Sequence, residues 1–237
     1  MRAVLLDIEG TTTPIDFVHK TLFPFARAQM RDFVRGNSLE IQAEIAQLRG
    51  EHADDFGNGD YREIFDESYH DSVGAYLQFL IDIDRKSTPL KSIQGKIWQK
   101  GYESGSLVSE IFDDVPAALK LWKSENKTVA IYSSGSVLAQ KLIFKYSDHG
   151  DLTPLIDHYF DTNIGRKLET ESFRKIALEL RHEPENIVFV SDIVEELDAA
   201  RAARMQTVLS IRNGNSVIKD RHTHASIQTF DELTHSK

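Results

Sequence analysis

Short apolar runs rich in β-branched residues recur along this chain, and each one leads into a polar or Gly/Ser turn. The runs occupy residues 3–6, 129–132, 187–190 and 207–211. Runs of this length and composition are typical of strands that are buried on both faces of a sheet. Segments with helical periodicity separate the last three runs, and alternation of strands with helices predicts a parallel, layered sheet. We therefore expect an α/β fold with a Rossmann-like core.

The stretch between the first two runs contains no convincing strand and indicates helices instead. This stretch covers residues 16–105 and is long enough to form a small domain of its own. We therefore expect a helical insertion over residues 16–105. The remaining segments, residues 1–15 and 106–237, would then form the α/β core.

Several local patterns support helices within the insertion. Apolar residues at positions 73, 76, 77, 80 and 81 have the spacing of one helical face. Asn37 and Glu40 resemble the capping pair at the start of a helix, and Thr88-Pro89 is expected to open another helix with proline at its first position. The glycine-rich Gly57-Asn58-Gly59 is expected to separate two helices.

Charge and composition limit the partners of the chain. It has 28 Lys+Arg against 37 Asp+Glu, a formal net charge of −9, and no cysteine, so disulfides and thiolate metal sites are excluded. A negative chain without a long basic run is poorly suited to nucleic acid or to an anionic membrane surface. No apolar stretch approaches the roughly 20 residues of a membrane helix, and the N-terminus becomes charged too early for a signal peptide. We expect a cytoplasmic protein.

Catalytic groups of open α/β sheets lie beyond the carboxyl ends of the strands. The first run is followed by Asp7-Ile8-Glu9-Gly10-Thr11-Thr12-Thr13. A carboxylate beside a divalent cation can attack a phosphoryl group, and a second carboxyl can protonate the leaving oxygen. Asp7 and Glu9 are candidates for these roles. The alternative is an aspartate that caps a turn, with threonines that bond to the local backbone.

Two further segments could bind an anion. Ser133-Ser134-Gly135-Ser136 follows the second run and leads into a predicted helix, whose N-terminus and hydroxyls would favour an anion, although serine is also a common helix cap. The loop at residues 163–169 presents Lys167, which could neutralise phosphate charge. Arg166 is its nearest competitor for that role, and a solvated lysine is the plain alternative.

Another strand-end carboxylate follows the run at residues 187–190. Asp192 could bind Mg²⁺, which prefers one or two carboxylates together with water and phosphate oxygens. Asp192 and Glu195 also match a D-x-x-E helix cap, and capping would compete for the same carboxylate oxygens.

The order of these motifs along the chain resembles that of the haloacid-dehalogenase-like phosphatases, and the helical insertion resembles their cap domain. Longer blocks are similar to one family among them, the enolase-phosphatases of methionine salvage, also called acireductone synthases. Glu9 is part of this similarity. Most of the superfamily has a second aspartate at this position, whereas the enolase-phosphatases resemble this chain in having glutamate. The chain departs from the family pattern at Phe25, where tyrosine is expected, and at Asn213, where proline is expected. The similar blocks are Asp7-Ile8-Glu9-Gly10-Thr11-Thr12-Thr13-Pro14-Ile15, Tyr132-Ser133-Ser134-Gly135-Ser136-Val137 and Lys167-Leu168-Glu169-Thr170-Glu171-Ser172-Phe173.

The resemblance implies a monomeric, Mg²⁺-dependent enzyme that converts a small phosphorylated diketone, 2,3-diketo-5-methylthiopentyl-1-phosphate, through its enol phosphate to acireductone and phosphate. It implies that Asp7 forms an aspartyl-phosphate while Glu9 acts as acid/base. The substrate ligands it implies are Ser133, Ser134 and Lys167, and the implied ligands of Mg²⁺ are the Asp7 carboxylate, the Glu9 backbone carbonyl and Asp192. The enolisation base is open, with Glu9 and His19 as the candidates.

Other functions are compatible with the same residues. One is a phosphatase or mutase of the same superfamily that acts on a sugar phosphate. A second is a regulatory module that binds phosphate without turnover, although the full set of Asp7, Lys167 and Asp192 argues against it. A dehalogenase fits less well, because Asp192 and the Glu9 spacing suit a metal-dependent site.

Overall fold

The computed structural model describes residues 1–216 and 222–234 and divides the chain into two compact units. One unit comprises Met1–Val18 and Val108–Lys237, and the other comprises His19–Leu107. Within the described residues, no helix is both long and apolar enough to cross a membrane. The interpretation of the helical unit as a cap stays a prediction.

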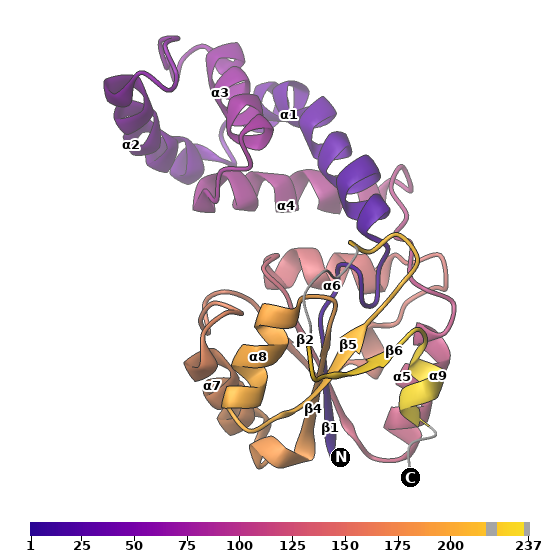
Figure 1. The fold of residues 1–237 in the computed structure, drawn as a ribbon. Coiled ribbons are helices and arrows are strands. Elements are labelled where there is room, and N and C mark those ends of the chain that lie inside the picture. The colour runs from indigo at the N-terminus through magenta and orange to yellow at the C-terminus, as the bar shows by residue number, and fades with distance from the viewer. Residues whose placement is uncertain (217–221, 235–237) are drawn as a thin grey trace. The chain divides into compact units, whose positions relative to one another are not determined.

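The first unit is built on a six-stranded parallel sheet with the strand order β3-β2-β1-β4-β5-β6 (Figure 1). The predicted α/β fold with a Rossmann-like parallel core is therefore confirmed. The strands are β1 (Ala3–Leu6), β2 (Thr128–Tyr132), β3 (His158–Phe160), β4 (Ile187–Ser191), β5 (Gln206–Ser210) and β6 (Ala225–Ile227).

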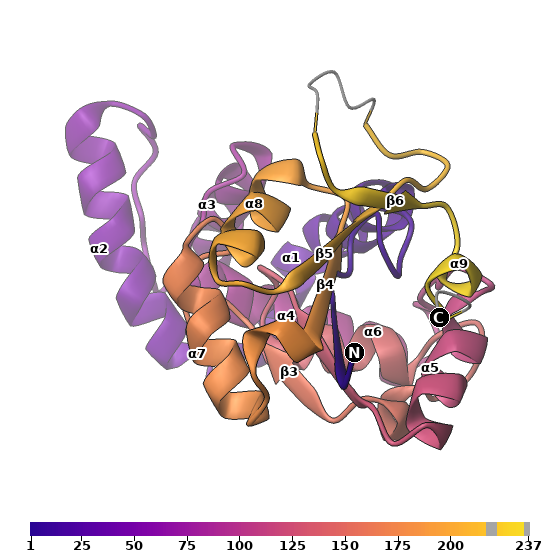
Figure 2. The same ribbon diagram turned by 60° about the horizontal axis from the view of Figure 1, so that its bottom comes forward.

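Helices cover both faces of this sheet, with α7 and α8 on one face and α5, α6 and α9 on the other (Figure 2). On the first face, the rings of Phe173 and Phe189 pack with centroids 5.0 Å apart, and on the second those of Trp122 and Phe230 lie 5.4 Å apart. Burial on both faces explains why the central strands are continuously apolar. The helices are α5 (Val115–Ser124), α6 (Val137–Lys145), α7 (Thr170–Leu180), α8 (Val194–Ala202) and α9 (Phe230–Thr234).

The sequence did not predict the two edge strands, β3 and β6. Each has only three residues and neither is fully buried, so no continuous apolar run marks it. The predicted run at residues 207–211 also differs from the structure at its end, because β5 stops at Ser210 and Ile211 is 42% exposed.

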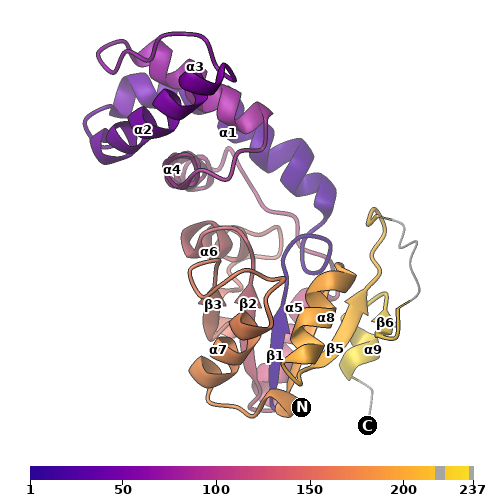
Figure 3. The same ribbon diagram turned by 60° about the vertical axis from the view of Figure 1, so that its left-hand side comes forward.

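The second unit contains four α-helices, and a π-helix (Phe17–Leu22) leads into the first of them (Figure 3). Helix α1 packs against α3 and α4, and α2 packs against α4. The predicted apolar face is confirmed in α3, where the side chains at positions 73, 76, 77 and 80 are fully buried. A buried carboxylate, Asp55, joins α2 to this core by accepting from the hydroxyl of Tyr76 at 2.8 Å and from Arg85 at 2.7 Å. The helices are α1 (Phe23–Asn37), α2 (Gln42–Asn58), α3 (His70–Asp82) and α4 (Thr88–Glu103).

Two helix boundaries in this unit differ from the predictions. Asn37 does not begin a helix but is the last residue of α1, where its Nδ2 donates to the carbonyl of Phe33 at 2.8 Å. Helix α4 begins at Thr88 as expected, but its cap is Ser87, whose Oγ accepts from the N–H of Leu90 at 3.2 Å. The glycine-rich segment does end α2, but Gly57 and Asn58 are its last two residues, and only Gly59 lies beyond it, as a cap with φ of 79°.

Candidate active site

The register of the central strands aligns the carboxyl ends of β1, β2 and β4, so the residues that follow these strands lie close together. Leu6 pairs with both Ile131 and Val190, so Asp7 leaves β1 between the ends of β2 and β4. The N–H of Asp7 still donates to the carbonyl of Val190 at 3.0 Å. The carboxyl ends of β2 and β4 therefore place Ser133 and Asp192 beside the first strand.

The chain forms a tight loop after Asp7. Oγ1 of Thr12 donates to the carbonyls of Asp7 and Ile8, both at 3.2 Å, so the expected bonding of threonine to local backbone is present. Gly10 has φ of +67°, and a Cβ there would lie 2.5 Å from Oδ2 of Asp192. Only glycine therefore fits at the point where this loop passes Asp192.

Lys167 lies between two carboxylates in the interior of this site. Its Nζ is 2.6 Å from Oδ1 of Asp7 and 2.8 Å from Oε2 of Glu196. Burial alone would lower the pKa of Lys167, but the two carboxylates outweigh burial and raise it above the ordinary lysine value. The ammonium therefore stays charged, and the alternative of a solvated lysine is wrong because only 9% of the side chain is exposed.

The loop that presents Lys167 is held from two sides. The hydroxyl of Tyr132 donates to the carbonyl of Gly165 at 2.8 Å, and Oγ of Ser172 donates to the carbonyl of Arg166 at 2.8 Å. Gly165 has φ of +138°, and a Cβ there would overlap Oγ of Ser172. Arg166, the competing cation, is exposed, so the loop directs Lys167 and not Arg166 into the interior.

Asp192 and Glu196 add negative charge to the same site. Burial and the nearby Asp7 carboxylate raise the pKa of Asp192 to about 7. Burial and Asp7 also raise the pKa of Glu196, which accepts from Oγ of Ser191 at 2.9 Å. Three carboxylates around one lysine leave an excess of negative charge that a cation would neutralise.

The donor set fits Mg²⁺ with few protein ligands. The described residues contain no group of three His, Asp or Glu side chains arranged to hold a metal ion. Mg²⁺ does not need one, since it usually keeps several waters and binds through one or two carboxylates. Oδ1 of Asn215 is buried without a hydrogen-bond partner and would lie 3.0 Å from a Cβ on Gly10, on the side of Asp192. This acceptor lacks a partner that a cation or its water could supply.

The serine segment is at the end of β2, but its residues have different surroundings. Ser136 is the cap of α6, since its Oγ accepts from the N–H of Ala139 at 3.3 Å. Ser133 is half-buried, and its Oγ accepts from the N–H of Gly135 at 3.3 Å, whereas Ser134 is exposed. The role of Ser133 and Ser134 toward phosphate stays a prediction.

The alternative that Asp192 caps a helix is wrong. Helix α8 begins at Val194, and its cap residue is Ile193, without a side-chain cap. The sequence did not indicate a role for Glu196, which contacts Lys167, whereas Glu195 of the D-x-x-E pattern is exposed. No local pattern separates Glu196 from Glu195, because the residue at which α8 begins decides which of the two faces inward.

Comparison with known proteins gives the family. The model of haloacid dehalogenase-like hydrolases matches residues 1–204. The chain belongs to this family. It is 48% identical over 229 residues to "Enolase-phosphatase E1" of Leptospira borgpetersenii, with 97% of this chain and 96% of that protein covered. It is 47% identical over 234 residues to the protein of the same name from Synechococcus elongatus, again with 97% and 96% covered.

A solved structure of similar fold extends this comparison. The UTR4 protein of Saccharomyces cerevisiae matches with a TM-score of 0.80 and 32% identity, covering 97% of this chain and 98% of the yeast chain. At this identity and coverage the chain is a full-length relative of the enolase-phosphatase E1 proteins and of UTR4, so the resemblance recognised from the motifs is confirmed.

Proposed function

We propose that this chain is an enolase-phosphatase of methionine salvage. The proposed substrate is 2,3-diketo-5-methylthiopentyl-1-phosphate, and the products are acireductone and phosphate. The observation that carries the proposal is the buried Lys167 between Asp7 and Glu196, because it places a charged cation against a strand-end carboxylate that can attack phosphorus. The names of the relatives support the substrate.

In the phosphatase step, the Asp7 carboxylate attacks phosphorus and the bond from phosphorus to the substrate oxygen breaks. Glu9 donates a proton to the departing oxygen, and water then hydrolyses the aspartyl-phosphate. Lys167 stabilises charge on the transferred group, with Ser133 and Ser134 as further ligands of its oxygens.

Asp7, Asp192 and the backbone carbonyl of Glu9 would hold Mg²⁺. When bound there, Mg²⁺ would polarise the diketone and spread phosphoryl charge. In the enolisation step a base removes a proton from carbon 1 of the substrate, and Glu9 is our candidate because its residue lies two positions after the nucleophile. His19 is the second candidate, from the helical unit.

The test is turnover of the diketo phosphate with Mg²⁺ and with EDTA, following enol absorbance and free phosphate separately. The expected result is a transient enol followed by phosphate, both lost with EDTA. Phosphate release from a panel of sugar phosphates, without release from the diketo phosphate, would overturn the proposed substrate. Binding of phosphate without any turnover would overturn the enzymatic proposal.

We also propose that the protein acts as a monomer in the cytoplasm. The absence of cysteine from the sequence and the net charge of −9 support a reducing, aqueous compartment. Light scattering coupled to size-exclusion chromatography should give a mass near the 26.9 kDa of one chain. A mass of two chains would contradict the monomer.

A further inference from the structure

Donors from other segments of the core unit bind the backbone carbonyls of the loop that follows the proposed nucleophile. The carbonyl of Gly10 accepts from Oγ of Ser210 at 3.1 Å and from Nδ2 of Asn215 at 2.9 Å. The carbonyl of Thr11 accepts from Nε of Arg212 at 3.2 Å. The carbonyl of Thr12 accepts from the N–H of Phe112 at 3.1 Å. Three consecutive carbonyls are therefore fixed by other segments of the core unit.

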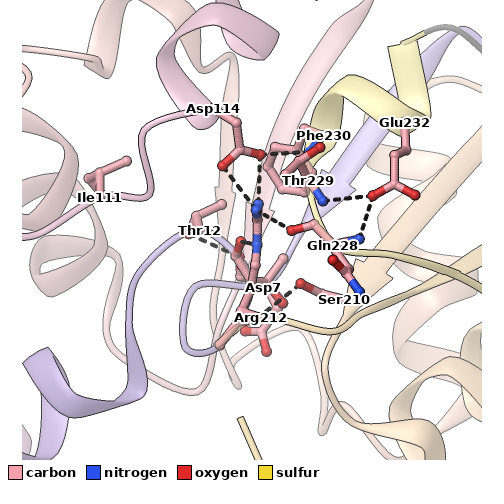
Figure 4. Close-up of polar contacts among 12 residues, drawn as sticks. Asp7, Thr12, Ile111, Asp114, Ser210, Arg212, Gln228, Thr229, Phe230 and Glu232 are labelled. Atoms are coloured by element: carbon pink, nitrogen blue, oxygen red, sulfur yellow. Dashed lines mark hydrogen bonds and ion pairs between the residues drawn. The ribbon is translucent and has the colours of Figure 1, made fainter. Parts of the chain in front are cut away.

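Arg212 connects these segments to one another (Figure 4). Its two terminal nitrogens bind the two carboxylate oxygens of Asp114, both at 2.9 Å, and Nη1 also donates to the carbonyl of Gln228 at 2.7 Å. Oδ2 of Asp114 in turn accepts from the N–H of Phe230 at 2.6 Å. The bidentate geometry fixes the plane of the guanidinium, and with it the direction of Nε toward Thr11.

The surroundings of this pair exclude water. The side chains of Arg212 and Asp114 are 4% and 11% exposed. The guanidinium carbon lies 4.6 Å from the ring centroid of Phe112 and 4.8 Å from that of Phe230. All three nitrogens of Arg212 have partners within the protein, which engage Nε, both N–H groups of Nη1 and one N–H group of Nη2. A buried ion pair of this kind is weak evidence for stability but defines geometry well.

We propose that Arg212, oriented by Asp114, is a positioning residue that sets where the Asp7 loop places its carboxylate. Strand β1 ends at Leu6, and the N–H of Asp7 still bonds to Val190, but the carbonyl of Asp7 accepts from Oγ1 of Thr12. The loop that Arg212 holds therefore contributes to where the Asp7 carboxylate meets Lys167. Displacement of a reacting group by about 1 Å can cost about 100-fold in rate. This inference rests on the proposed function, because it takes Asp7 as the nucleophile.

The test compares Arg212→Lys and Arg212→Met with a matched control, Lys123→Met. Lysine keeps the charge, but a single ammonium cannot reproduce the bidentate contact with Asp114 together with the separate contact of Nε with the carbonyl of Thr11. The control breaks the Lys123–Asp157 ion pair (2.5 Å), which lies where β2 begins, at the opposite end of the strand from the site. Measurements are kcat and KM for phosphate release with Mg²⁺, and the thermal unfolding midpoint.

We expect both Arg212 variants to lose about 30- to 100-fold in kcat, with KM changed by less than about threefold. Arg212→Lys should retain more thermal stability than Arg212→Met and yet lose a similar part of kcat. The control should lose stability without loss of kcat. Folded Arg212→Lys with kcat within about threefold of wild type would overturn the inference.

A readout independent of turnover is the binding of beryllium fluoride, a phosphoryl analogue that attaches to aspartate carboxylates, followed by ¹⁹F NMR. Weaker binding to Arg212→Lys than to the wild type and to Lys123→Met is the expected result, and equal binding would contradict the inference. Failure of the proposed function is distinguishable, since it would appear as wild-type protein that does not turn over the diketo phosphate.

Discussion

Nζ of Lys167 lies 2.6 Å from Oδ1 of Asp7, and the same oxygen accepts from the N–H of Ile8 at 2.7 Å. Two donors on one carboxylate oxygen fix the orientation of the whole group. The ammonium also contacts Glu196, so it is held between an acid that directly follows β1 and an acid on α8. In a buried site such a fixed charge stabilises a developing phosphoryl charge without reorganisation.

Lys167→Met should lower kcat for phosphate release by about 10²- to 10³-fold, because the fixed positive charge beside Asp7 is lost. Steady-state phosphate release at saturating Mg²⁺ measures this. The matched control is Lys175→Met, an exposed lysine on α7, which should keep wild-type kcat. Equal kcat in the two variants would show that Lys167 has no role in the reaction.

Glu196→Gln should lower kcat by about tenfold, which corresponds to about 1.4 kcal/mol. Glutamine can still accept a hydrogen bond from Ser191, but it has no negative charge to form an ion pair with Lys167. Glu195→Gln is the matched control, since Glu195 is adjacent in sequence but exposed. A similar loss in both variants would indicate an effect of net charge on α8 and not of the contact with Lys167.

The central strands of the fold could be predicted because they are buried on both faces. β1, β2 and β4 are continuous apolar runs for this reason, and their parallel arrangement follows from the helices between them. The edge strands β3 and β6 have three residues each and one paired neighbour, so packing with the rest of the chain decides them. No local pattern carries that information.

Site residues could be predicted where a local motif marks them. They could not be predicted where the role of a residue depends on its contact with a residue far away in the sequence. Asp7 and Lys167 were both named from their own motifs, and the structure brings them into contact. Glu196 was not named, because the start of α8 decides which glutamate faces inward. The pair of Asp114 with Arg212 spans 98 positions and has no local sequence signal.

Asp192→Asn should raise the thermal midpoint of the EDTA-treated protein, because it removes a half-buried carboxylate close to Asp7. Mg²⁺ should then no longer raise that midpoint, since a ligand stabilises only the state that binds it. Differential scanning fluorimetry across a Mg²⁺ titration measures both effects. A Mg²⁺-dependent increase equal to that of the wild type would remove Asp192 from the metal ligands.

Gly165→Ala should destabilise the loop that presents Lys167. The residue has φ of +138°, and the added Cβ would overlap Oγ of Ser172, so the cost should exceed the about 1–3 kcal/mol of backbone strain alone. Gly150→Ala is the control, with φ of +84° and no atom within 4 Å of the added Cβ. Urea unfolding should show the larger loss for Gly165→Ala. Equal losses would mean that contact with Ser172 contributes nothing.

The surroundings of His224 predict that the free energy of unfolding of the core unit depends on pH. Its Nδ1 accepts from Arg201 and from Oγ1 of Thr207 at 2.7 Å, while Nε2 lies 3.1 Å from Oδ1 of Asp198, so the ring is neutral with its proton on Nε2. Burial, together with the charge of Arg201, lowers the pKa of His224 below its ordinary value. Protonation of Nδ1 would break the two bonds that it accepts.

Because the folded state therefore takes up this proton less readily than the unfolded chain, the stabilisation by neutral His224 is present above about pH 6.5 and is lost as pH falls below that value. Urea unfolding at pH 5, 6, 7 and 8 should show a smaller loss at low pH for His224→Gln than for the wild type. His158→Gln, at an exposed position on β3, should keep the wild-type dependence. If His224→Gln also kept it, the acid sensitivity of the protein would have to come from other groups.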